Sequence, residues 1–319
     1  MRRSHGLLLA AFALWACQTR LGAPEPVAEA SDATRKELAR EAVGAYVEQI
    51  QRVLALALRL RVAGAGLCGD AVAPILGLHL EQRLPGGGAR AYVEALSESL
   101  GVDDRVTVVA VAPDSPADRA GVRAGDRVLR VDGKEAKRVR HVFEALRGEP
   151  ERPPVLALER DGAGLEVTLE RVIGCDAEIW LAYSDEITTG RVSGAAQGFV
   201  TTGFVRFAAD DDELAAAIAH EIAHRAIGGL PGTYPEAELR ADALSLEILR
   251  RAGRDPAAAL RLWERFAVEK PWMIVFEPRS NFLNEPPHGR LAERLLEMPR
   301  LLEPSDRAPD LARSRPESR

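Results

Sequence analysis

The chain of 319 residues is long enough for two domains, and its hydrophobic content of 46% is ordinary for a globular protein with a core. A formal net charge of -6 gives no basic footprint, which argues against nucleic acid as a partner. We therefore expect a folded protein whose partners are proteins, peptides or small molecules.

The N-terminus predicts a signal peptide over residues 1–17. Arg2 and Arg3 precede an apolar stretch that is too short to span a membrane as a mature helix, and the stretch ends at Cys17. The sequence "LWAC" resembles the lipobox of bacterial lipoproteins, although Trp15 departs from it, and plain signal cleavage is the alternative. The resemblance implies lipidation of Cys17 and, with Gln18 next to it, a periplasm-facing lipid anchor on the outer membrane.

A linker over 18–32 precedes a segment, 33–99, that we expect to form the N-terminal helical part of the main domain. Apolar residues recur at helical spacing over 34–60, which predicts one long helix. A glycine cluster, "LPGGGAR", predicts a loop before a short helix over 91–100.

From residue 105 the apolar period changes to that of strands. Alternating segments, turns such as Asp132-Gly133 and one intervening helix over 139–148 predict a small β-rich domain. The stretch "SPADRAGVRAGDRVLRVDGK" resembles a PDZ domain of bacterial proteases, over about 100–172. The resemblance implies possible peptide binding by strand addition, although no clear carboxylate-binding loop is found.

After residue 172 the pattern predicts strands over 177–183 and 198–208 and helices over 210–229 and 235–253. We assign 173–302 to the core of the main domain. The remaining residues, 303–319, are charged and contain prolines, and we expect a disordered tail.

The predicted helix over 210–229 carries the pattern H-E-x-x-H. His220 and His224 are four residues apart and share a helix face, with Glu221 at its edge. Two neutral imidazoles can hold one Zn2+ ion, and a carboxylate beside them can take a proton from water. Burying two histidines in an alanine-rich helix is costly unless an ion coordinates them, so the sequence predicts a zinc site.

Catalytic zinc usually has three protein ligands, and the following helix offers four carboxylates as the third: Glu236, Glu238, Asp242 and Glu247. Glu238 and Asp242 share a face, so Glu238 can reach the metal while Asp242 accepts the second N–H of a ligand histidine.

Through "DDDELAAAIAHEIAH" and "ELRAD" the sequence resembles the HtpX and CAAX-prenyl-protease family of gluzincin metallopeptidases. The resemblance implies zinc at His220, His224 and Glu238, catalysis at Glu221 and a supporting role for Asp242. "HGRLAER" matches a later family motif and implies that His288 acts near the open zinc position and that Arg294 supports the site.

The sequence also departs from that family. Gly289 replaces the usual proline, the usual Asn-Ala dipeptide is missing around "SDEITTGRVSGAAQG", and the family's membrane helices are absent. These departures favour the soluble, BepA-like branch.

Three cysteines are an odd number, but lipidation of Cys17 leaves Cys68 and Cys175 as a pair in an oxidising compartment. Because they flank the PDZ-like segment, we expect them to form a disulfide.

The expected fold class is α+β: a mainly helical, zincin-type metallopeptidase domain with a small β-rich PDZ-like insertion. The expected function is a zinc endopeptidase of the cell envelope that acts on misfolded or unassembled proteins. The alternative is a non-proteolytic chaperone or assembly scaffold that keeps zinc for structure.

Overall fold

The computed structural model describes residues 31–83, 90–147, 152–191, 197–227, 234–271 and 291–303. Within these ranges, no helix combines the length and the apolar character needed to cross a membrane. Cys17, the predicted signal peptide and nearly all of the predicted tail lie outside them.

The described chain mixes helices and strands. The helices are α1 (Asp32–Gly64), the 3-10 turn η1 (Ala65–Leu67), α2 (Arg90–Leu100), α3 (Pro116–Arg119), α4 (Val139–Arg147), α5 (Thr202–Phe207), α6 (Asp211–Ile227), α7 (Tyr234–Arg251), α8 (Ala257–Glu269) and α10 (Leu291–Leu302). The strands are β1 (Val72–Pro74), β2 (Leu78–Glu81), β3 (Thr107–Val111), β4 (Arg127–Val131), β5 (Lys134–Glu135), β6 (Val155–Arg160), β7 (Ala163–Thr168), β8 (Ile173–Cys175), β9 (Glu178–Ala182), β10 (Thr189–Arg191) and β11 (Gln197–Thr201).

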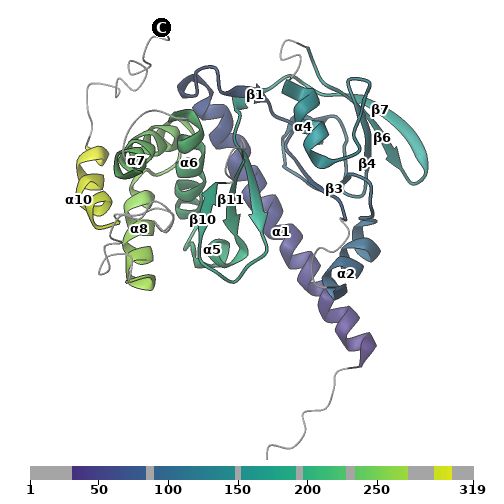
Figure 1. Ribbon diagram of the computed structural model, residues 1–319, viewed down its shortest axis with the longest axis horizontal. Helices are drawn as coiled ribbons and strands as arrows, with labels where there is room; N and C mark the ends of the chain where they lie inside the picture. The colour runs from purple at the N-terminus through teal and green to yellow at the C-terminus, as the bar shows by residue number, and fades with distance from the viewer. Residues whose placement is uncertain are drawn as a thin grey trace, which may run out of the picture.

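The elements divide between two hydrophobic cores. The larger core joins α1 to the helices from α5 onward and to the three-stranded sheet β10-β11-β9, and it also takes in residues of α2 and β3. The smaller core lies within the sheet β2-β3-β4-β6-β7 and helix α4. Figure 1 shows α1 running diagonally between the helical part, which carries α6, α7, α8 and α10, and the β-rich part.

Helix α1 lies along both parts of the molecule. Its apolar residues recur at helical spacing over most of its length, so it has an apolar face to bury. Ser31 caps the helix by accepting a hydrogen bond from the backbone N–H of Thr34. Further along, the buried Tyr46 hydroxyl donates to the carbonyl of Leu181 in β9, at 2.9 Å. The helix is therefore fixed to the strand that borders the larger core.

The β-rich part begins earlier in the chain than residue 100, where the sequence analysis placed its boundary. Strand β2 pairs antiparallel with β3, with Leu78 opposite Val111. Just before β2 in the chain, β1 pairs antiparallel with β8, the strand that follows the β-rich part. In this pair Pro74 lies opposite Ile173. The chain therefore enters and leaves the segment 75–172 at adjacent positions, Pro74 and Ile173.

Cys68 and Cys175 form a disulfide beside this junction, with their Cα atoms 5.6 Å apart. The bond spans 107 residues and closes a loop that contains the whole inserted segment.

The prediction of one strand over 198–208 is wrong for its second half. Strand β11 ends at Thr201, whose hydroxyl accepts from the backbone N–H of Phe204 and so starts helix α5. A Cβ at Gly203 would lie 2.4 Å from the carbonyl oxygen of Asp185, so only glycine fits there. The apolar pattern did not reveal this change because the residues on both sides of it are buried.

Candidate metal centre

Helix α6 lies at the centre of the larger core and carries the H-E-x-x-H residues. Asp210 caps it by accepting from the backbone N–H groups of Asp212 and Glu213, at 2.9 and 2.8 Å. Its alanines from Ala215 to Ala223 are almost fully buried and leave room for the neighbouring helices to approach. His220 and Glu221 are consequently inside the protein, each 1% exposed.

Three predicted ligands converge at the contact of α6 with α7. Nε2 of His220 lies 3.0 Å from Nε2 of His224 and 3.2 Å from Oε2 of Glu238. Nε2 of His224 lies 3.2 Å from Oε1 of Glu238. His220 and Glu238 are almost fully buried, and His224 is the most exposed of the three, with 11% of its side chain accessible.

These distances fit a zinc ion. Ligand atoms at about 2.0–2.1 Å around a tetrahedral zinc ion are roughly 3.3 Å apart, close to the three distances in this cluster. The donor set also fits, because imidazole nitrogen and carboxylate oxygen are zinc ligands. Because these nitrogen and oxygen atoms lie within 3.2 Å of one another and are largely buried, a shared cation would offset the cost of burying them.

Asp242 and Arg294 support the cluster from behind. Oδ1 of Asp242 lies 3.0 Å from Nδ1 of His220, which favours the proton on that nitrogen and leaves Nε2 to face the cluster. Arg294, from α10, donates to both carboxylate oxygens of Asp242, each at 2.7 Å. Its guanidinium also stacks on the ring of Trp263, 4.4 Å from the ring centroid.

Buried charges shift the pKa values of this group. Burial alone would raise the pKa of Asp242, but the charge and hydrogen bonds of Arg294, with those of His220, lower it to about 2. Burial lowers the pKa of His224 and outweighs the opposing carboxylates. For His220, burial and Arg294 favour a lower pKa, but contacts with Asp242 and Glu238 outweigh them and raise it.

Glu221 lies next to the ligand cluster but is held by another element. Its Oε1 accepts a hydrogen bond from the hydroxyl of Thr189, in β10, at 2.8 Å. Strand β11 also approaches it, since a Cβ at Gly198 would lie 3.2 Å from Cβ of Glu221. A buried carboxylate in this position has the chemistry of a general base.

The structure distinguishes among the four carboxylates that the sequence offered as third ligand. Glu238 lies in the cluster and Asp242 behind it, whereas Glu236 is exposed. Glu247 pairs with Arg251, at 2.8 Å. Arg294 reaches the site as the sequence motif implies, while His288 lies outside the described residues.

The sequence analysis missed two residues at the site, Thr189 and Trp263. The ring of Trp263 contacts that of His220 edge-on, with centroids 5.6 Å apart. No local motif marks either residue, since each reaches the site only through the packing of a distant strand or helix.

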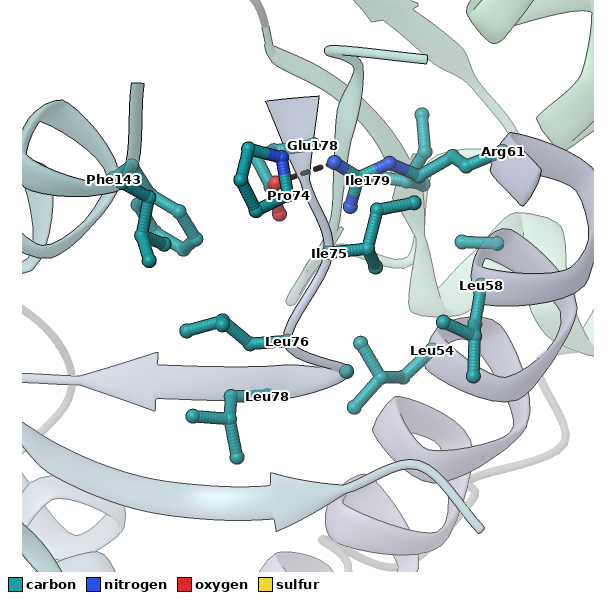
Figure 2. Close-up of a pocket in the computed structure, with 13 residues that line it drawn as sticks. Leu54, Leu58, Arg61, Pro74, Ile75, Leu76, Leu78, Phe143, Glu178 and Ile179 are labelled. Carbon is teal, nitrogen blue, oxygen red and sulfur yellow. Dashed lines mark hydrogen bonds and ion pairs between the residues drawn. The ribbon is translucent and has the colours of Figure 1, made fainter. Parts of the chain in front are cut away.

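A second feature is a pocket at the junction of the two cores, shown in Figure 2. In this view Ile75 points toward α1, whereas Leu76 points to the opposite side, toward Phe143 of α4. Arg61 of α1 donates to the carboxylate of Glu178 at 2.7 Å. The pocket leaves about 10 Å³ of accessible space, room for about one water molecule.

The PDZ domain family matches residues 107–160. A protein named as a zinc metalloprotease from Ralstonia nicotianae is 32% identical over 170 residues, which are 50% of this chain and 36% of that protein. The regulator of sigma-E protease RseP of Salmonella typhimurium is 37% identical over 59 residues, 18% of this chain and 13% of that protein. The chain thus spans about a third or less of these relatives.

Among solved structures, the HtrA-type protease AlgW with a decapeptide is 27% identical to this chain, with a TM-score of 0.26. The match covers 32% of this chain and 29% of the AlgW chain. The HtrA3 PDZ domain bound to a phage-derived ligand matches 32% of this chain and 88% of its own, at 24% identity and a TM-score of 0.27. The chain contains a PDZ domain and is homologous to proteins named as zinc metalloproteases.

Proposed function

We propose that this protein is a zinc-dependent endopeptidase. The observation that carries the proposal is the convergence of His220, His224 and Glu238, with Glu221 buried beside them. The relatives named as zinc metalloproteases support Zn2+ as the ion and proteolysis as the activity.

His220, His224 and Glu238 would hold the zinc ion, which when bound lowers the pKa of water and polarises a carbonyl group. Glu221 takes the proton from the attacking water and later delivers it to the leaving amine. Asp242 keeps the His220 ring oriented, and Arg294 keeps Asp242 ionised.

At a finer level, we propose a gluzincin of the HtpX and CAAX-prenyl-protease type with a zincin-type core. The sequence motifs around His220, Glu238 and Arg294 support this assignment, because their side chains meet in one cluster. We further propose that the protein is an envelope lipoprotein, anchored through Cys17, that degrades misfolded or unassembled proteins. The N-terminal sequence pattern supports that location.

The competing function is a zinc-stabilised scaffold or chaperone without proteolysis. A structural zinc site is normally closed by four protein ligands. The described cluster supplies three, and a buried carboxylate lies beside them. This arrangement favours the peptidase.

The test is incubation of the purified, zinc-loaded protein with a reduced, unfolded substrate protein, with new amino termini as the readout. The matched control is Glu221→Gln, which keeps the size of the side chain and removes the base. We expect cleavage by the wild type and none by the variant, at equal zinc content. Equal cleavage by both would contradict the role of Glu221, and no cleavage by either would favour the scaffold.

We also propose that the PDZ domain binds peptides by strand addition. PDZ domains take an extended peptide at an exposed sheet edge, and β2 is an edge strand of the six-stranded sheet. A peptide side chain would need the junction pocket, lined by Leu78 of β2 and Phe143 of α4, to widen beyond its room for about one water molecule. Titration with fluorescent peptides that end in a free or an amidated carboxyl group tests this proposal, and no saturable binding of any peptide would contradict it.

A further inference from the structure

Thr189 joins an edge strand of the three-stranded sheet to the proposed catalytic base. It is the first residue of β10, which pairs with β11 and forms one edge of the order β10-β11-β9. The Thr189 hydroxyl donates to Oε1 of Glu221 at 2.8 Å, and both residues are 1% exposed. The two lie 32 positions apart in the sequence, so the fold creates this contact.

The surrounding structure keeps Thr189 in place. Thr189 lies opposite Val200 of β11, and Val200 is fully buried in the larger core. Gly198, in the same strand, lets the backbone approach Glu221, because a Cβ there would come within 3.2 Å of Cβ of Glu221. Glu221 is thus confined by β11 at its Cβ and by Thr189 at its carboxylate.

We propose that Thr189 is the positioning residue for Glu221, an inference that rests on the proposed peptidase function. A general base must lie within hydrogen-bond reach of the proton that it abstracts, and a carboxylate at the end of a flexible side chain needs a support to stay there. The Thr189 hydroxyl fixes one carboxylate oxygen and thereby the rotation of the group. The second oxygen then keeps a constant direction.

Thr189→Val is the sharpest variant, because valine keeps the branched shape and removes only the hydroxyl. We expect kcat to fall about tenfold or more, a part of the 10²–10⁴-fold contribution of a general base, while KM and zinc content stay within about twofold. Thr189→Ser keeps a hydroxyl and should restore most of kcat. A merely structural role would not separate serine from valine in this way.

A second readout does not depend on activity or on metal. In the metal-free protein, Thr189→Val removes a donor from a buried carboxylate, which costs stability, whereas no such cost arises once the carboxylate is gone. We expect Thr189→Val to lower the melting temperature by about 2–4 °C in the wild-type background. In a Glu221→Leu background the same replacement should change it by less than half of that shift.

The outcomes separate the role of Thr189 from the proposed peptidase function. Wild-type kcat in Thr189→Val, or equal melting shifts in the two backgrounds, would overturn the inference and leave the peptidase intact. If Thr189→Val does not fold, Thr189→Ala is used in its place. If Thr189→Val and Thr189→Ala both lose zinc, the role of Thr189 is structural and the inference is overturned. An inactive, zinc-loaded wild type would overturn the proposed function itself and the inference with it.

Discussion

Asp242 links the metal-ligand cluster to the last described helix. Its carboxylate contacts His220 on one side and receives two hydrogen bonds from Arg294 on the other. This ion pair is buried, so it stabilises the fold mainly while both partners are charged. Its protonation should therefore be visible in the acid stability of the protein.

The pKa of Asp242 is lowered from 3.8 to about 2 in the folded state. A lowered pKa adds stability above the unfolded value, and this stability is lost as the pH falls from about 4 to about 2. The shift corresponds to about 2 kcal/mol. Urea unfolding of the metal-free protein should show this loss, and Asp242→Asn should lack it.

The matched control is Asp32→Asn, which makes the same replacement at an exposed carboxylate at the start of α1. The same slope in Asp242→Asn as in the wild type would contradict the assignment of this acid transition to Asp242.

At the same scale, the sequence was sufficient for His220, Glu221 and His224, because four-residue spacing on a helix defines their relative positions. Among the four carboxylates on α7, the face that Glu238 shares with Asp242 and the family resemblance pointed to Glu238 as the third ligand. In the structure, packing distinguishes it, since α7 turns Glu238 into the core and Glu247 toward Arg251. Thr189 gave no signal because its partner lies on another element.

At the scale of elements, the long helix and the β-rich segment could be predicted because their apolar periods differ. Strands β1 and β2 were missed. They are only three and four residues long, and their apolar residues pack in different cores, with Val72 of β1 against the larger core and Leu78 and Leu80 of β2 in the smaller. A short stretch whose apolar residues pack into two cores shows no single period of apolar residues along the sequence.

The disulfide between Cys68 and Cys175 fixes the residue that follows η1 to β8. In a Cys17→Ser chain, denatured without reduction, we expect no free thiol, because the two remaining cysteines are bonded. For a loop of about 100 residues, the chain-entropy model gives roughly 4–5 kcal/mol, an upper value that strain reduces. Thiol titration gives the count, and unfolding with and without reductant gives the stability difference.

Two free thiols per chain would refute the bridge in solution. An unchanged unfolding midpoint after complete reduction would show instead that the bond forms but adds no stability.

At the scale of the whole molecule, the chain enters and leaves the inserted segment at one antiparallel pair, β1 with β8, while Ile75 and residues of α2 and β3 pack in the larger core. Replacing 75–172 by a short Gly/Ser turn from Pro74 to Ile173 should leave a protein that folds cooperatively and binds zinc, because these two residues are already cross-strand partners. Zinc content and a single unfolding transition are the measurements. Loss of both would show that the inserted segment is part of the peptidase core.

The central claim is that His220, His224 and Glu238 hold one zinc ion, and zinc analysis of matched variants tests it most directly. Glu238→Ala removes the proposed carboxylate ligand, whereas Glu247→Ala removes a carboxylate of the same helix that pairs with Arg251. After dialysis against a weak chelator, we predict about one zinc per chain in the wild type and in Glu247→Ala, and far less in Glu238→Ala. Full zinc in Glu238→Ala would contradict the account.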